Sequence, residues 1–208
     1  NAVIQKPIRT VQEVNNALQQ VNQLNQQLTE AISHLHPLSN NDALKAARLE
    51  LENKINQTVQ TDGMTQQSVD AYQNAKREAQ NESNTALALI NNGDATEQQI
   101  TNETNSVNQA INALNKAKND LRADKSQLEH AYNQLIQNVD TNDKKPASIQ
   151  QYQAARQAIE TQYNNAKSEA HQILENGNPS VNEVAQALQK VEAVQLKVND
   201  AIHMLQDK

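Results

Sequence analysis

The sequence predicts an all-α protein of tandem three-helix bundles, strung end to end as an elongated rod, with a long helix shared between successive modules. Three observations predict this fold. Apolar residues recur at heptad spacing in three stretches, each stretch opens with the same capping pattern, and two of the three glycines stand in Asn-Gly pairs, at 92–93 and 176–177. Heptad stripes flanked by polar residues are typical of amphipathic helices that pack in bundles.

The composition limits the kind of core that this sequence can build. Its 208 residues include no Phe, Trp or Cys and only four Tyr, whereas Asn and Gln together number 58. A thin core of Leu, Ile, Val and Ala fits these residues, and the periodicity argues against disorder of the Asn/Gln-rich sequence. The net charge of −6 and the scarcity of aromatic rings argue against a nucleic-acid partner. No apolar run reaches the ~18–20 residues of a membrane span, so we expect no membrane insertion.

The first expected element is a helix over about 10–35. Its apolar stripe consists of Val14, Leu18, Val21, Leu24, Leu28, Ala31, Ile32 and Leu35. We interpret residues 1–40 as the terminal helix of a preceding repeat followed by a broken linker, which makes the sequence a piece of a longer chain. We therefore expect this helix either to pair with the helix near 43–60 or to be poorly ordered.

The next expected unit is a three-helix repeat over 41–121, followed by a second over 122–208. In the first unit Ser68, Tyr72 and Ala75 mark the start of the middle helix, and Ser148, Tyr152 and Ala155 repeat them in the second unit. Farther along the same helices, Ala86 and Ile90 recur as Ala170 and Leu174. The stretch between these two sets of corresponding residues is four residues longer in the second unit. This is about one helical turn, which would preserve the buried face.

The Asn-Gly pairs mark the turn between the second and third helix of each unit. Gly93 and Gly177 are expected to adopt the left-handed conformation that ends many helices. The helices that follow begin with a capping box, Thr96 to Gln99 and Ser180 to Glu183, and the first helix begins the same way with Thr10 and Glu13. Their stripes run through Ile100, Val107, Ile111, Leu114 and Leu121, and through Val184, Leu188, Val191, Val194, Val198, Ala201, Ile202 and Leu205.

The joint between the two units is expected to be stiff. Residues 97–139 contain neither Gly nor Pro. We predict one helix over this range, roughly 65 Å long at ~1.5 Å per residue, that serves both units.

Residues capable of chemistry are scattered. His34 and His36 fall on different helical faces without further ligands, His130, His171 and His203 stand alone, and we expect all five to be structural or exposed. Segment 140–143 lacks the Gly and Glu of a calcium loop and is expected to be a turn. Tyr72 and Tyr152 are expected to pack in the core or at its edge rather than to contact a partner. The sequence predicts no catalytic, cofactor-binding or metal-binding residues and no cofactor, so we expect a protein that is not an enzyme.

The repeated pattern S-[VI]-x-x-Y-x-x-A, then A-x-x-[LI]-[IL]-x-N-G, then a heptad helix, resembles the FIVAR-type repeats of giant staphylococcal extracellular-matrix-binding proteins. The resemblance implies a cell-wall-associated bacterial surface protein that binds host matrix, fibronectin above all, besides contacting its neighbouring repeats. It also implies that albumin-binding-like modules can be interspersed, and segment 36–60 departs most from its counterpart. It assigns no partner-binding residues. Two other hypotheses stay open: a structural spacer of the cell envelope and an intracellular helical scaffold.

Overall fold

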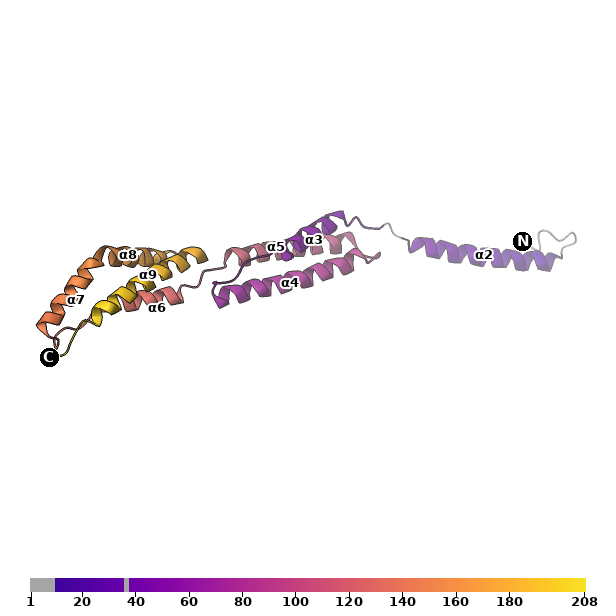
Figure 1. Cartoon of the computed structure of the whole chain (residues 1–208). Helices are drawn as coiled ribbons and strands as arrows, with labels where there is room; N and C mark the ends of the chain where they lie inside the picture. Colours follow the sequence, from indigo (N-terminus) through magenta and orange to yellow (C-terminus); the bar gives the residue numbers. More distant parts are fainter. Residues whose placement is uncertain (1–9, 36–37) are drawn as a thin grey trace.

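A computed structural model describes residues 10–35 and 38–208, and these residues form eight α-helices without a β-strand. In chain order the helices are α2 (Val11–Ser33), α3 (Asp42–Ile55), α4 (Gln66–Ile90), α5 (Glu97–Asn119), α6 (Ser126–Leu135), α7 (Pro146–Ala158), α8 (Glu160–Glu175) and α9 (Val181–Ile202). Figure 1 shows two helical bundles in line, with α2 beyond the N-terminal end of the first. The predicted all-α fold of helical bundles is confirmed.

The first bundle consists of α3, α4 and α5, which all pack against one another. Its core is built from one apolar stripe of each helix because the opposite faces are polar and solvated. The buried side chains are Leu44, Ala47, Leu51 and Ile55 of α3, Tyr72, Ala79 and Ala86 of α4, and Ile100, Val107, Ile111 and Leu114 of α5. Alanines on α4 let the neighbouring helices approach closely, so a thin core reaches full burial without Phe or Trp.

The second bundle consists of α6, α7, α8 and α9, and α9 contacts each of the other three. Its buried side chains include Leu128 and Leu135 of α6, Ala166 and Ala170 of α8, and Val184, Ala187, Val191, Val194 and Val198 of α9. The predicted stripes on the third helix of both units are therefore the ones that face the cores.

The middle helix of the second bundle is not continuous. It is interrupted at Ile159, which ends α7 and precedes α8. The interruption falls within the four-residue insertion relative to α4. Since four residues rotate a helix about 40° beyond one full turn, a continuous helix would bring the apolar stripe out of register. The expectation of one longer middle helix is wrong, because the helix is divided at Ile159, whereas Ala166 and Ala170 of α8 still face the core.

All three predicted capping boxes are present. The side chains of Thr10, Thr96 and Ser180 accept a hydrogen bond from the backbone N–H three residues later. In return, the side chains of Glu13, Gln99 and Glu183 accept one from the backbone N–H of the cap residue. Each box satisfies backbone N–H groups that have no partner within the helix. Such a cap contributes about 1 kcal/mol to stability.

The predicted left-handed glycines are wrong. Of the described glycines only Gly63, in the α3–α4 loop, has a positive φ, 75°. The asparagines of the Asn-Gly pairs make the turns instead. Asn92 Oδ1 accepts from the backbone N–H of Asp94 at 3.0 Å, and Asn176 Oδ1 accepts from that of Asn178 at 2.9 Å. An asparagine side chain that mimics a backbone turn in this way removes the need for positive φ.

The long helix shared between modules is also wrong. α5 ends at Asn119 and α6 begins at Ser126. Residues 120–125 form a linker that pairs with the α3–α4 loop: Thr65 N donates to Arg122 O at 2.8 Å, and Asp124 N donates to Gly63 O at 2.8 Å. These tertiary hydrogen bonds compete with continued helix, so a stretch without Gly and Pro does not by itself imply one helix.

The same pairing recurs at the far end of the second bundle. Lys145 N donates to Gln206 O at 2.8 Å, and Lys208 N donates to Asp143 O at 3.1 Å. Single antiparallel bridges, Met64 with Ala123 and Lys144 with Asp207, lie at equivalent places in the two bundles. The segment that leaves each third helix therefore docks on the loop between the first and second helices.

Helix α2 packs against no other described helix. Its apolar stripe is exposed, for example 45% at Val14 and 64% at Leu24. The expected pairing with the helix near 43–60 is therefore not found. That helix, α3, occupies the first position of its own bundle.

Candidate binding surface

Among the described residues, no group of three or more His, Asp or Glu side chains is placed to hold a metal ion. His171 stacks on Tyr132 with ring centroids 6.1 Å apart, and His203 caps α9. His34 caps α2, while His36 lies outside the described residues.

The other residues considered for chemistry have structural surroundings. Asp140 Oδ1 accepts from the backbone N–H of Asn142 at 3.0 Å, which makes the 140–143 segment a turn. Tyr72 is buried in the first core, and burial raises the pKa of its hydroxyl. Tyr152 is only partly buried and is not among the residues of the second core.

Aromatic packing in the second bundle centres on a tyrosine that the sequence pattern did not single out. Tyr163 hydroxyl donates to Leu135 O at 3.2 Å, and the Arg156 guanidinium lies 4.4 Å from the centre of its ring. Tyr163 occupies the position of buried Ala79 in the first bundle when the two Asn-Gly turns are superposed in sequence. Counting back from the two Asn-Gly turns gives this position from the sequence alone.

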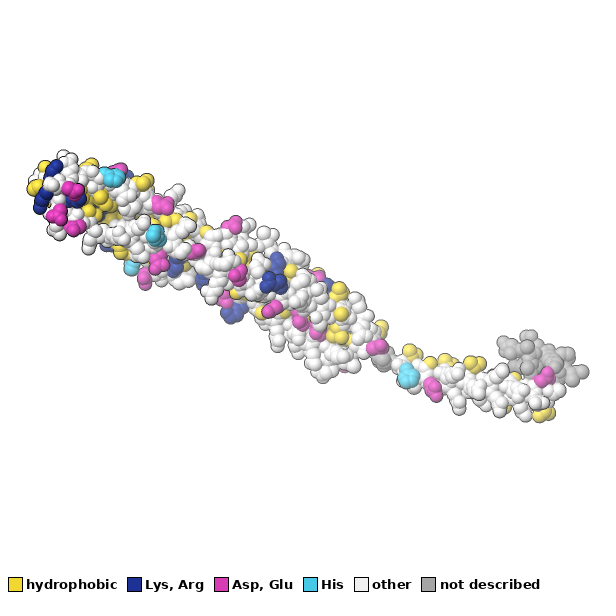
Figure 2. Space-filling view, turned by 90° about the horizontal axis from the view of Figure 1, so that it is seen from below, with side chains coloured by type: hydrophobic (Ala, Val, Ile, Leu, Met, Phe, Trp, Pro, Cys, Tyr) yellow, Lys and Arg dark blue, Asp and Glu magenta, His cyan; other side chains and the backbone are white. Residues whose placement is uncertain are grey.

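Apart from the exposed apolar stripe of α2, the surface outside the cores is mostly polar and carries mixed charges. Figure 2 shows Lys, Arg, Asp and Glu scattered over one face among uncharged polar side chains. Each of the four tyrosines is at least partly buried, so the protein exposes no large aromatic anchor. Interfaces that rely on a few strong contacts are usually centred on such anchors. The surface therefore favours many weak contacts over one strong one.

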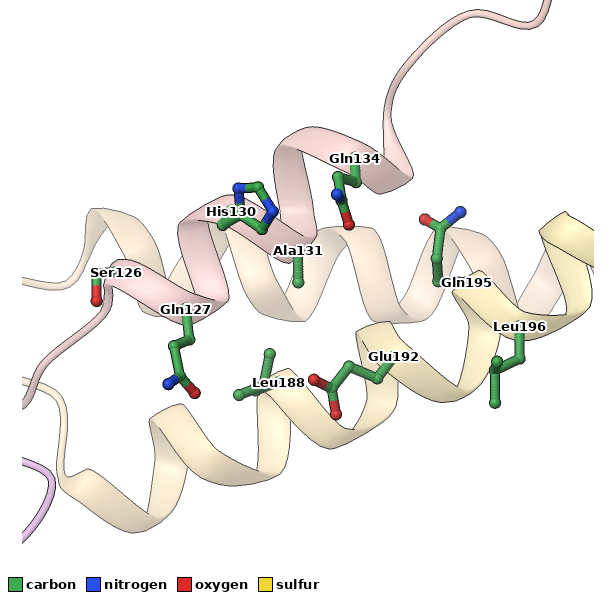
Figure 3. A pocket seen from close by; sticks show the side chains of 9 residues that line it. All are labelled: Ser126, Gln127, His130, Ala131, Gln134, Leu188, Glu192, Gln195 and Leu196. Atoms are coloured by element: carbon green, nitrogen blue, oxygen red, sulfur yellow. The ribbon is translucent and has the colours of Figure 1, made fainter.

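A groove with a partly apolar lining lies between α6 and α9 (Figure 3), with a volume of about 580 Å³. Leu188 and Leu196 of α9 line it beside Gln127, His130 and Gln134 of α6. Leu196 is 67% exposed. In the first bundle the positions equivalent to these two leucines are Thr104 and Asn112, so this groove is not a repeated feature.

A second groove, between α8 and α9, has charged walls. Lys190 Nζ lies 2.7 Å from Glu169 Oε2, and Lys197 Nζ donates to Gln162 Oε1 at 2.5 Å. Both lysines are engaged across the groove, and the Lys190–Glu169 pair is solvent-exposed. Exposed pairs of this kind contribute little to stability. The groove therefore offers a surface of mixed character, with two lysines and one glutamate among apolar and amide side chains.

None of the described helices has an apolar stretch long enough to cross a bilayer.

Comparison with known proteins matches most of the sequence to one family. The FIVAR domain matches residues 1–36, 47–115 and 131–199. The extracellular matrix-binding protein EbhB of Staphylococcus aureus strain Newman is 51% identical over 140 residues, which cover 67% of this chain and 2% of that protein. EbhB of strain N315 is 49% identical over 140 residues, 4% of its length. The protein described here thus spans a small part of these relatives.

A solved structure also matches. It comes from a characterisation of extracellular matrix binding protein (Embp)-mediated Staphylococcus epidermidis adherence to fibronectin. The match has 30% sequence identity and a TM-score of 0.30, and covers 78% of this chain and 98% of the other.

Proposed function

The chain belongs to the FIVAR family, and from this premise we propose that it is a non-enzymatic repeat segment of a bacterial cell-surface adhesin that binds host extracellular matrix. Its relatives are named for matrix binding. Fibronectin is the matrix protein to test first. We place the protein on the cell wall and divide it into modules at 41–121 and 122–208, with the two core clusters on either side of that division.

One observation carries the proposal. The repeated helical bundles have a mostly polar surface without large exposed aromatic side chains that could anchor a partner. Many proteins that bind extended partners add a strand to a sheet edge. The described residues of this protein form helices and only isolated bridges, so strand addition does not suit it. We infer that helical faces make weak polar contacts, and that attachment depends on avidity for clustered ligand.

Retention on fibronectin layers of graded density tests this proposal. We expect binding of the full chain to rise steeply with layer density and to be weak for soluble fibronectin. A helical protein of matched composition serves as the control. Retention equal to that of this control would support the spacer hypothesis, and equally tight binding to soluble and immobilised fibronectin would contradict avidity.

The variant Leu196→Asn tests whether binding is spread over many helical faces or located at the α6–α9 groove. It installs the residue type that the first bundle has at this position, and the side chain is exposed, so folding should change by less than about 0.5 kcal/mol. We expect retention to stay near that of the unmodified protein. Loss of retention to the level of the helical control would assign binding to the groove.

A further inference from the structure

The two Asn-Gly turns contain glycines that the backbone does not require. Neither Gly93 nor Gly177 has a positive φ. A Cβ at Gly177 would meet no atom within 4 Å, and one at Gly93 would meet only Leu38 Cδ2, at 3.7 Å, an ordinary contact. By contrast, a Cβ at Gly63 would lie 2.5 Å from Val181 Cγ1. Conformation and packing therefore explain Gly63 but not the glycines of the repeated turns.

The asparagines before these glycines are exposed and held in the same arrangement. Residues 91–94 and 175–178 are solvent-exposed. In both turns the asparagine Oδ1 accepts a backbone N–H two residues later, from Asp94 and from Asn178. A hydrogen bond to Oδ1 draws electron density from the amide carbon Cγ and makes it a better electrophile. A following glycine leaves the backbone nitrogen next to that carbon without a shielding side chain.

We propose that Asn92 and Asn176 are sites of spontaneous deamidation, one in the same turn of each bundle. The backbone nitrogen of the following glycine attacks Asn Cγ and forms a new bond to it. The bond between Cγ and Nδ2 breaks, and ammonia leaves with the proton from the glycine nitrogen. Water then opens the cyclic imide at either carbonyl, which gives aspartate or isoaspartate. The net reaction consumes one water, releases one ammonia and converts a neutral amide into a carboxylate.

The two sites differ in the groups that lie next to the new carboxylate. A carboxylate at the C-terminal end of a helix faces the negative end of the helix dipole. In the second bundle Lys125 Nζ lies 2.7 Å from Leu174 O and 2.9 Å from Asn176 O, next to the new charge. In the first bundle the corresponding residue is Asn41, whose neutral amide donates to Ile90 O at 3.2 Å. Deamidation at Asn92 therefore places a charge at the end of α4 beside a neutral amide, where the second bundle has a lysine.

Peptide mapping by mass spectrometry of the full chain, aged in warm, mildly alkaline buffer, tests the proposal. Enzymatic methylation of isoaspartate identifies the rearranged product. We expect Asn92 and Asn176 to be converted first. Asn105 provides an internal control, because it precedes Ser106 in the middle of α5. Conversion of Asn92 and Asn176 no faster than that of Asn105 would overturn the proposal.

Gly93→Ala and Gly177→Ala are the matched variants. Both positions have room for a Cβ and need no positive φ, so circular dichroism should not change and the unfolding midpoint should not fall. We expect each variant to slow conversion several-fold at its own asparagine and leave the other site at its original rate. If the mutated site reacts as fast as before, the glycine does not control the reaction and the proposal fails.

Discussion

Glu82 of α4 and Glu103 of α5 bring two carboxyl groups together where the second bundle has Ala166 and Ala187 at the equivalent positions. One oxygen of Glu103 is buried without a hydrogen-bond partner. Burial, and next the charge of Glu82, raise the pKa of Glu103 above its ordinary value of 4.5. A proton on either group would allow a hydrogen bond between them, whereas two charges repel each other.

This pair predicts an unusual pH response of stability. Because the folded pKa of Glu103 is raised, its stabilising contribution is fully present below the unfolded pKa and is lost as pH rises through the folded pKa. We therefore expect Glu103→Gln to match the unmodified protein in acid and to be more stable near neutral pH. Urea-unfolding midpoints of both proteins between about pH 4 and pH 7 measure the difference.

The same comparison with Glu50→Gln, an exposed carboxylate on α3, provides the control and should give no such divergence. Other titrating groups cancel because each pair of proteins shares them. These include Asp120, whose pKa is lowered first by its hydrogen bond to Lys116. A stability difference between Glu103→Gln and the unmodified protein that is constant over this pH range would contradict the assignment.

At the scale of helices, the same sequence pattern has two outcomes. Leu28 of α2 and Leu114 of α5 occupy corresponding positions in their heptad stripes. Leu114 is 3% exposed within a bundle, whereas Leu28 is 58% exposed on a helix without a described partner. A heptad stripe thus predicts an amphipathic helix, but burial depends on which other helices are present.

We expect Leu114→Ala to lower the free energy of unfolding by about 2–5 kcal/mol, because it removes buried methyl groups and leaves a cavity. Leu28→Ala should change it by less than about 0.5 kcal/mol, as exposed substitutions do. Chemical denaturation monitored by circular dichroism measures both. Similar losses in the two variants would show that α2 is packed in solution.

The elements that could be predicted from sequence are those that local patterns determine. Capping boxes and heptads located the starts of α2, α5 and α9 and the buried faces of α5 and α9. The linker at 120–125 could not be found this way, since it ends α5 through hydrogen bonds to residues 63–65, which are distant in sequence. The break at Ile159 and the groove beside Leu196 likewise depend on how neighbouring helices meet.

The Asn-Gly turns show a different limit of prediction from sequence. The sequence predicts their position correctly but favours a turn made by the glycine, because αL glycines end many helices. In the structure the asparagine side chain makes the turn. A turn made by an αL glycine and a turn made by the asparagine side chain are both compatible with an Asn-Gly pair, so sequence alone does not distinguish them.

At the scale of the whole molecule, Gly63 connects the two bundles. Its φ of 75° suits glycine, and Val181 at the start of α9 lies where a Cβ would be. Its carbonyl oxygen also accepts from Asp124 N in the linker. This one residue therefore contacts both the linker and the second bundle.

We expect Gly63→Ala to cost about 1 kcal/mol in backbone strain and to change the relative placement of the bundles, because the new methyl group displaces Val181. Since the sequence has no cysteine, spin labels on cysteines introduced at exposed Gln73 and Gln172 report the inter-bundle distance. The double variant Gly63→Ala/Val181→Ala should restore that distance but not the stability. Gly177→Ala is the control and should neither change that distance nor lower stability. An unchanged distance in Gly63→Ala would exclude a role in the joint.

The polypeptide enters and leaves the first bundle at opposite ends. Ser39 and Asn41, before α3, bind the carbonyls of Ala95 and Ile90 at the α4–α5 turn, while Arg122, after α5, pairs with Thr65 at the other end. A tensile load on the rod therefore runs through the full length of every bundle. The 23 residues of α5 span about 35 Å, but the roughly 80 residues of an opened bundle reach about 270 Å. Under tension, a chain of such modules would lengthen several-fold as its bundles open, and this lengthening would limit the force until the bundles are unfolded.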